Sequence, residues 1–510
     1  MQRFGSTLWA VGLLLAWEIF AQLHPDSLLI AGPTAICTYI WANLGLTTRA
    51  IGATVSSALW GFLWGNLVAV ILSGMTVLFP RSTRILSAFA LLVFCLPLVA
   101  TGPILRVLYG PGNGPQITLA AIAVYYTTYL ALLVGLRAVP HSWLDLASVY
   151  GRGALTKLVI VRARASLPYL FVGLQIAAPA ALLGAMIGEF TGAERGMGVL
   201  TLRAMRGLET DATWALATLA AGLAILAYTG FGWLGRWLVG YAPVVLLSPP
   251  KQTSNAGPLI RFAELCLIVI LALLVWQFSM DIFDLNRFFA KRPGDILTFL
   301  TIADNRETLF AALFETLTLT VPGYFAGLIL GAALATILIL LPNVSRGILP
   351  IAIALRSIPI ITTAPLLVLA LGRGIVGTVT IVAVMIFFPT LVACLQGLRQ
   401  TSGQIVDVFE SYGAGRFRLL ITAQIPAMLP AFFAAARMAV PAALLAVTTA
   451  EWLATGKGIG TLMALTASTS NYNMLWSSVL VLSLAAAIGY ALVAWCERVV
   501  LRTYASEQVL

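Results

Sequence analysis

Charged side chains are scarce in this 510-residue sequence. Lysine, arginine, aspartate and glutamate together make up 10% of the residues, whereas hydrophobic residues make up 60%. Soluble domains carry about 25% charged residues, so this composition excludes a chain of soluble domains. Backbone groups in lipid must pair internally, and apolar runs of ~20 residues therefore indicate membrane-spanning helices. The alternation typical of barrel strands is missing, so we expect an all-α polytopic membrane protein.

Residue types that carry catalysis or bind metals are also rare. His24 and His141 are the only histidines, and neither lies at a metal-ligand spacing. None of the four lysines completes a GxxxxGKS/T phosphate loop, and the five cysteines form no CxxC pair. We therefore expect no catalytic residue, no metal and no cofactor in this chain, and no ATP hydrolysis through such a loop.

The positive charge is spread along the chain. The formal net charge is +11, but the basic residues form no continuous stripe. This pattern favours positively charged cytoplasmic loops over a nucleic-acid-binding surface. With both termini in the cytoplasm, Lys and Arg divide into 17 cytoplasmic, 11 external and 2 within spans. We expect both termini to be cytoplasmic, and no nucleic acid as a partner.

Apolar runs predict twelve membrane spans in two groups of six. We interpret a polar, proline-containing stretch at 241–258 as a linker between a first half, 1–240, and a second half, 259–510. The run 8–23 resembles a signal peptide but lacks a convincing cleavage site, so we interpret it as a retained first span. The predicted spans are 8–23, 52–76, 85–105, 117–136, 168–190 and 213–235, then 259–278, 312–341, 348–371, 375–396, 429–452 and 475–497.

The two halves share one residue offset, 262, without a gap. Among the matching positions are Gly61 and Gly323, Pro97 and Pro359, Glu189 and Glu451, and the pairs Gly196-Met-Gly198 and Gly458-Ile-Gly460. A constant register over this length indicates an internal duplication. Six spans per repeat is an even number, so the repeats are parallel. Glycines four residues apart, as in Gly61/Gly65 and Gly323/Gly327, predict close helix packing.

Each half contains one polar island between apolar runs, at about 140–167 and 400–429. The islands contain Asp145-Leu-Ala-Ser-Val-Tyr-Gly151 and Asp407-Val-Phe-Glu-Ser-Tyr-Gly413, again 262 residues apart. A short amphipathic helix, a glycine bend and a proline opening the next helix are predicted for both.

These islands resemble the EAA loop of permease subunits of ATP-binding-cassette (ABC) importers. Pro426 lies 13 residues after Gly413, as in that family, whereas the first copy has Arg164 there. The runs Ala185 to Gly198 and Ala450 to Gly460, with Leu355-Arg-Ser-Ile-Pro359, are similar to nitrate/sulfonate/taurine-type permeases, which also take up pyrimidine precursors. The resemblance implies two fused type I importer permeases in a bacterial inner membrane.

The resemblance also implies partners and roles. It implies two copies of a cytoplasmic ABC ATPase, which would hold ATP and Mg, and a periplasmic or lipid-anchored substrate-binding protein. The solute would be small, with an organic or inorganic anion or a pyrimidine precursor expected. The residues predicted to couple to the ATPases are Asp145, Leu146, Val149, Tyr150, Gly151, Leu155, Asp407, Val408, Phe409, Tyr412, Gly413 and Phe417.

Five polar residues within spans are candidates for the translocation path or its gate. Unpaired charges there cost about 2.5–3.5 kcal/mol or more, so Arg356 and Arg437 should face the path or a partner. Gln175 occupies the first-half position that matches Arg437. Glu189 and Glu451, near external span ends, are expected to act in a gate or helix cap more than in substrate contact.

Three alternatives remain at this point. A fused ferric-iron-type ABC permease also carries EAA-like loops. An ion-coupled secondary transporter of twelve helices shares the repeat arrangement but would not need the islands, and Leu78 to Arg84 lacks the major-facilitator pattern. A membrane enzyme lacks a catalytic constellation in the sequence.

Overall fold

The computed structural model describes residues 15–23, 30–240, 258–341, 374–452 and 456–504, together with scattered single residues elsewhere. Within these ranges all regular structure is helical. In the described part of the chain, eight helices are long and apolar enough to cross a membrane, and a bent pair of helices would make a ninth span. This architecture agrees with the predicted all-α polytopic fold of about twelve spans.

The long helices divide evenly between the repeats. The first repeat contributes α3 (Leu44–Leu78), α6 (Gly114–Arg137), α9 (Ala163–Phe190) and α11 (Thr210–Val239), and the second α14 (Ala303–Leu340), α17 (Ile375–Arg399), α20 (Ile425–Ala450) and α22 (Tyr472–Tyr504). Shorter helices are α2 (Pro33–Ala42), α4 (Thr83–Phe94), α5 (Leu98–Tyr109), α7 (His141–Val149), α8 (Ala154–Thr156), α10 (Met197–Arg206), α12 (Pro258–Ile282), α13 (Pro293–Thr301), α18 (Gly403–Ser411), α19 (Arg416–Leu419) and α21 (Gly458–Ser468).

The predicted span at 85–105 is wrong as a single straight helix. The structure has two helices there, α4 and α5, which meet at 88°. Pro97 precedes α5 and has no N–H to donate, and its ring disfavours a helical conformation at Leu96. The helix therefore breaks between Cys95 and Pro97.

Other predicted boundaries shift or cannot be compared. α3 and α14 begin at Leu44 and Ala303, several residues before the expected 52 and 312, because a helix can continue beyond the apolar layer. The span 259–278 corresponds to α12. All but the last residue of the linker at 241–258, six residues of the first span at 8–23, and most of the span at 348–371, including Arg356, lie outside the described residues.

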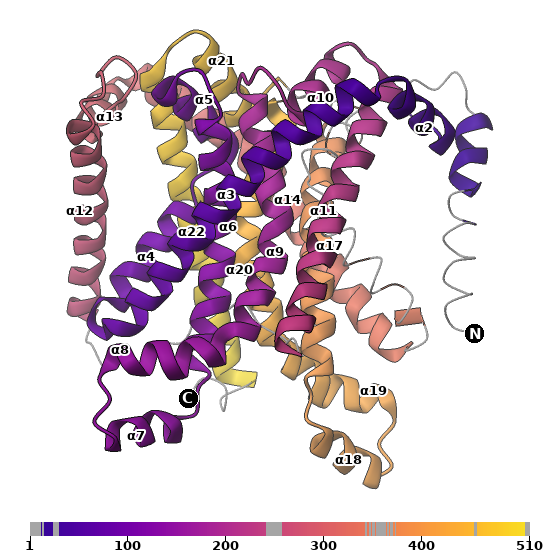
Figure 1. Ribbon diagram of the computed structural model, residues 1–510, viewed down its shortest axis with the longest axis vertical. Coiled ribbons are helices and arrows are strands. Elements are labelled where there is room, and N and C mark those ends of the chain that lie inside the picture. Colours follow the sequence, from indigo (N-terminus) through magenta and orange to yellow (C-terminus); the bar gives the residue numbers. More distant parts are fainter. Residues whose placement is uncertain are drawn as a thin grey trace.

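The two faces of the bundle carry different short helices. Figure 1 shows α7 and α8 of the first repeat, and α18 and α19 of the second, projecting from one end of the bundle. The short helices α10, α13 and α21 lie at the opposite end (Figure 1). The polar islands of the two repeats are therefore on one face, as parallel repeats require.

Close helix packing follows the repeat register. A methyl group added at Gly65 would lie 2.6 Å from the Ala121 carbonyl oxygen of α6. The same addition at Gly327 would lie 2.6 Å from the Ala383 carbonyl oxygen of α17, 262 residues later. Only glycine permits backbones to approach this closely. The predicted packing role of the Gly61/Gly65 and Gly323/Gly327 pairs is confirmed.

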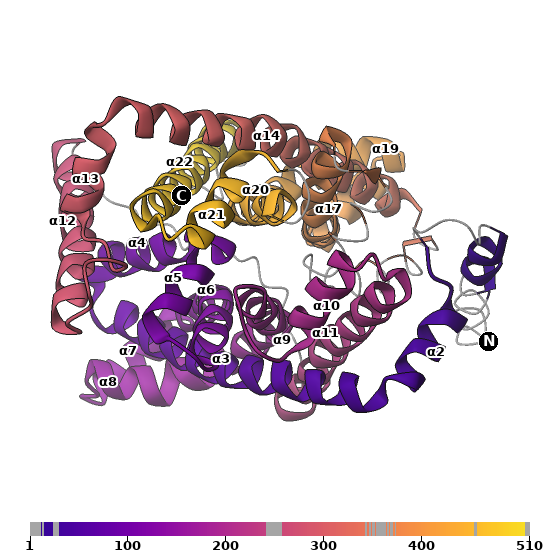
Figure 2. The same cartoon turned by 90° about the horizontal axis from the view of Figure 1, so that it is seen from above.

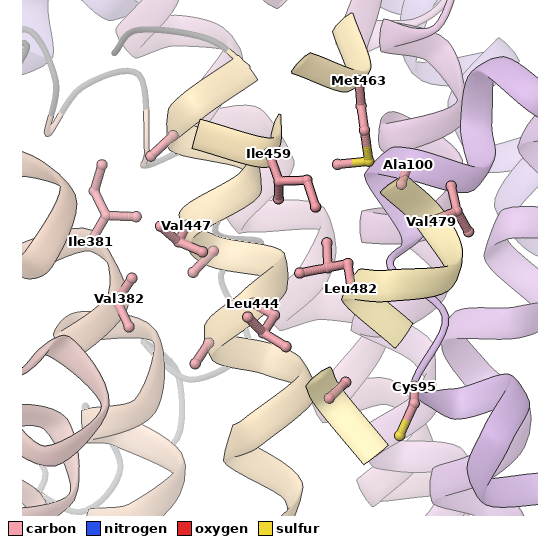
Figure 3. Packing of buried hydrophobic residues seen from close by; sticks show 14 of the residues in the cluster. Cys95, Ala100, Ile381, Val382, Leu444, Val447, Ile459, Met463, Val479 and Leu482 are labelled. Atoms are coloured by element: carbon pink, nitrogen blue, oxygen red, sulfur yellow. The ribbon is translucent and has the colours of Figure 1, made fainter. Parts of the chain in front are cut away.

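The two repeats lie side by side and share a core (Figure 2). Cys95, Ala100 and Ile104 at the α4–α5 break belong to one buried cluster with residues of α20, α21 and α22. Figure 3 shows Cys95 and Ala100 beside Val479, Leu482 and other apolar side chains of the second repeat. Arg84 of α4 also forms an ion pair with Glu264 of α12. The broken helix of the first repeat is therefore part of the contact between repeats.

Replacing Gly184 of α9 by leucine is expected to lower stability. A methyl group there would lie 2.6 Å from the Leu119 carbonyl oxygen, so the side chain would separate α9 from α6. Overpacking of this kind costs about 1–3 kcal/mol. Thermal unfolding in detergent would measure the loss, with Gly52→Leu as the control, because no atom lies within 4 Å of a methyl group at Gly52. Equal stability of the two variants would contradict this packing.

Candidate functional site

The first polar island folds as a helical hairpin on one face of the bundle. α7 ends in a glycine turn at Gly151, whose φ is +66°, a conformation that favours glycine. The Gly151 N–H donates to the Ser148 carbonyl (2.9 Å) and the Arg152 N–H to the Ala147 carbonyl (3.0 Å). This pair of bonds is a Schellman motif, which satisfies carbonyls that the helix end leaves free.

The second island repeats this geometry. α18 ends at Gly413, with φ +65°, whose N–H donates to the Glu410 carbonyl over 2.9 Å. The Ala414 N–H donates to the Phe409 carbonyl, also over 2.9 Å. Two loops 262 residues apart therefore share one conformation, and the predicted glycine bends are confirmed.

Large apolar side chains project from both hairpins. Val149 is 84% exposed and Tyr412 is 86% exposed, whereas large apolar side chains are most often buried in a folded protein. Phe409 differs from the other apolar residues predicted to couple to the ATPases, because it is half-buried. Asp145 and Asp407 are exposed. The remaining exposed anchors are Leu146, Tyr150, Leu155, Val408 and Phe417.

A π-helical segment follows each hairpin. It covers Lys157–Arg162 in the first repeat and Leu420–Gln424 in the second. Helix continues through these segments, so that Ala154–Phe190 and Arg416–Ala450 are each one candidate span. These segments were not predicted from the sequence, although π-bulges are often found at functional sites. Each hairpin is thereby joined without a break to a long helix of the bundle.

Arg437 is paired inside the second repeat. Its Nη1 lies 2.7 Å from Glu497 Oε2 of α22, and both side chains are almost fully buried. Its guanidinium carbon also lies 6.0 Å from the Tyr490 ring centroid. Arg437 thus contacts a partner, one of the two placements that the sequence analysis expected.

The matching position in the first repeat is neutral. Gln175 of α9 contacts α11, where a methyl group at Gly232 would lie 2.5 Å from the Gln175 Nε2. Gly235 occupies the first-repeat position that matches Glu497. The buried ion pair is therefore specific to the second repeat.

Glu189 forms a compact set of hydrogen bonds at the opposite end of the bundle from the hairpins. Thr54 of α3 donates its hydroxyl to Glu189 Oε1 over 2.6 Å, and the same hydroxyl accepts the Met197 N–H over 2.8 Å. The Gly198 N–H donates to Glu189 Oε2 over 2.6 Å. One carboxylate thus joins the end of α9 to α3 and to the start of α10, and we call this arrangement the first carboxylate clamp.

The second repeat contains the same clamp around Glu451. Thr316 of α14 donates to Glu451 Oε1 (2.8 Å) and accepts the Ile459 N–H (2.9 Å). The Gly460 N–H donates to Glu451 Oε2 over 2.8 Å. The Gly458 N–H also donates to Glu315 Oε2 over 3.1 Å. The bond from Gly458 to Glu315 has no first-repeat equivalent, because Ala53 occupies the position matching Glu315.

The clamps explain the Gly-x-Gly motifs. Gly196 has φ +137° and Gly458 φ +86°, and a side chain at either position would overlap the clamp carboxylate. Glycine lets the chain turn tightly into α10 or α21, so that the N-terminal amides of the short helix reach the carboxylate. Carboxylates are stabilised at helix N-termini. The threonine partners were not predicted, because no local pattern places Thr54 beside Glu189.

No part of this arrangement resembles a catalytic centre. Among the described residues, no group of three or more His, Cys, Asp or Glu side chains could hold a metal ion. The arrangement offers exposed apolar loops on one face, buried hydrogen-bonded carboxylates near the other, and long helices that connect them.

Comparison with known proteins identifies the fold family. The family model for the binding-protein-dependent transport system inner membrane component matches residues 61–240 and again residues 323–504. A probable ABC transporter permease protein of Haemophilus influenzae is 28% identical over 46% of this chain and 96% of its own length. The formylaminopyrimidine transport permease protein ThiX of Halalkalibacterium halodurans is 27% identical over 47% of this chain and 94% of its own.

A third relative gives the same picture. The putative aliphatic sulfonates transport permease protein SsuC of Escherichia coli is 24% identical over 45% of this chain and 88% of its own length. Each relative thus matches about half of this chain and nearly all of itself, in agreement with the predicted internal duplication. The chain belongs to the binding-protein-dependent transport system inner membrane component family, is a multi-pass ABC transporter permease, and contains the family domain twice.

Proposed function

We propose that the two repeats together form the complete translocation pathway of an ABC importer, driven by two ATPase subunits that bind the α7–α8 and α18–α19 hairpins. The observation that carries this proposal is the pair of matching hairpins with exposed apolar side chains on one face. A short amphipathic helix seated in a groove is a recurring mode of protein recognition. Both hairpins and both chain termini would then be cytoplasmic.

Movement would pass between the hairpins and the bundle. Each hairpin continues into a long helix, so a displacement at the ATPase reaches α9 in one repeat and α20 in the other. ATP-driven closure of the ATPases would bring the hairpins together and turn the pathway from inward-facing to outward-facing. ATP and Mg would be held by the ATPases, and a periplasmic or lipid-anchored binding protein would deliver the solute to the opposite face.

The solute is proposed to be a small organic molecule. Relatives of this chain are described as permeases for formylaminopyrimidine, riboflavin, aliphatic sulfonates and taurine. An organic anion or a pyrimidine precursor fits this range, whereas ferric iron does not. The family match also argues against an ion-coupled secondary transporter. The pairing of Arg437 with Glu497 argues against an unpaired arginine as the anion contact.

Reconstituted transport tests this proposal. The chain would be placed in proteoliposomes with the ATPase and binding protein expressed alongside it, and uptake of taurine, an alkanesulfonate, riboflavin, formylaminopyrimidine, nitrate and ferric iron would be compared. We expect uptake of one organic solute that requires both ATP and the binding protein. Uptake driven by an ion gradient without ATP would refute the importer proposal, and uptake of ferric iron alone would refute the proposed solute class.

A further inference from the structure

Each carboxylate clamp lies at the far end of the helix that starts at a coupling hairpin. The helical stretch Ala154–Phe190 begins with α8, the second helix of the first hairpin, and ends one residue after Glu189. The stretch Arg416–Ala450 begins with α19, the second helix of the second hairpin, and ends one residue before Glu451. A displacement at either hairpin therefore reaches the opposite face of the bundle at a clamp.

α9 is supported along its length by α6. Added methyl groups at Gly173, Gly184 and Gly188 would lie 3.1, 2.6 and 2.6 Å from atoms of α6. At the hairpin end, a methyl group at Gly135 of α6 would lie 2.7 Å from Tyr169 of α9. Prolines allow α9 to bend, at Pro168 and Pro179, but this close packing holds it to α6 from end to end. α9 and α6 should therefore move together.

At its end, α9 is joined to α3 and to the start of α10 by the hydrogen bonds of the clamp carboxylate, beside apolar packing among Ala50, Met186 and Met197. Glu189 accepts from Thr54 of α3 and from the Gly198 amide of α10, and Glu189 itself is buried. Separating these elements would leave a buried carboxylate without donors, which is costly. The same argument holds for Glu451, Thr316 and Gly460 in the second repeat.

We propose that Glu189 with Thr54, and Glu451 with Thr316, are positioning residues that transmit ATPase-driven movement from α9 and α20 to the short helices α10 and α21 on the opposite face. This inference rests on the proposed coupling function. With the clamps intact, α10 and α21 follow the ends of α9 and α20. With the clamps broken, the hairpins still bind and respond to the ATPases, but the far face no longer follows.

The test separates ATP hydrolysis from uptake. Thr54→Val and Thr316→Val remove one hydroxyl each with little change in shape. The double variant removes the threonine bonds from both clamps and keeps the amide bonds of Gly198 and Gly460 to the carboxylates. Matched controls are Thr47→Val on α3 and Thr320→Val on α14. Both hydroxyls are buried and bond only locally: Thr47 donates to the carbonyls of Asn43 and Leu44, and Thr320 donates to the carbonyl of Thr316. Reconstituted with ATPase and binding protein, the double clamp variant should hydrolyse ATP within about twofold of wild type, while solute taken up per ATP falls about tenfold.

A distance measurement provides the second readout. Spin labels at positions 203 on α10 and 465 on α21, both exposed, would report the spacing of the two short helices with and without ATP. The ATP-dependent change in this distance should be lost in the double clamp variant and kept in the control pair. Thr54→Ser with Thr316→Ser restores both hydroxyls and should restore uptake and the distance change.

Two results would overturn the inference. If uptake and hydrolysis fall together while the ATP-dependent distance change persists, the clamps do not transmit movement. If the double clamp variant transports as the controls do, the clamps are dispensable. The proposed function fails in a different way, because wild-type protein would then show no ATP-dependent uptake at all. That result would also refute the transmission of movement through the clamps.

Discussion

Replacing Gly151 and Gly413 together by valine is expected to abolish ATP-driven uptake and association with the ATPase. Both glycines have positive φ, at +66° and +65°, where a β-branched side chain is strongly disfavoured. A left-handed conformation costs an L-residue about 1–2 kcal/mol, so the turn should open and the Schellman bonds should break. The exposed apolar side chains of each hairpin would then no longer be held in one arrangement. Co-purification with the ATPase and uptake in proteoliposomes would measure the loss.

The same loops contain matched controls. Gly153 and Gly415 are exposed, have φ of −70° and −67° with extended ψ, and no atom lies within 4 Å of an added methyl group. Valine there adds the same bulk to the same loops without left-handed strain. Gly153→Val with Gly415→Val should therefore keep the ATPase bound. An intact complex and normal uptake in the Gly151→Val/Gly413→Val protein would contradict a coupling role for the hairpins.

Sequence reasoning predicted those elements whose signal is local or repeated. The glycine bends at Gly151 and Gly413, the repeat offset and the close packing at Gly65 and Gly327 are all encoded within a few residues or in a constant spacing. The 88° break between α4 and α5 also had a local signal, Pro97, but the apolar run continues through it. Hydropathy alone therefore predicted a single span there.

The missed features depend on contacts between distant segments. Thr54 and Glu189 are 135 residues apart, and the hydroxyl of one meets the carboxylate of the other only because α3 crosses the end of α9. Arg437 was expected to face the path or a partner, but Glu497 was not identified as that partner. α22 brings Glu497 to Arg437 from 60 positions further along the chain, and no pattern within either helix indicates the pair.

Breaking the Arg437–Glu497 ion pair from one side is expected to destabilise the protein strongly. Both side chains are buried, with exposed fractions of 8% and 11%, and their charged atoms are 2.7 Å apart. Removing one partner leaves an uncompensated buried charge, which typically costs about 3–5 kcal/mol. Arg437→Gln and Glu497→Gln should each lower the thermal unfolding temperature and the yield of folded protein. Thermal unfolding in detergent would measure both.

The double variant Arg437→Gln/Glu497→Gln should recover most of the lost stability, because two neutral amides leave no uncompensated charge. The first repeat shows that this site packs without a charged pair, since Gln175 and Gly235 occupy the matching positions. If the ion pair serves the structure of the second repeat, uptake should return together with stability in the double variant. Restored stability with uptake still lost would instead show that Arg437 contacts the solute during transport, a role that its pairing with Glu497 in this conformation argues against.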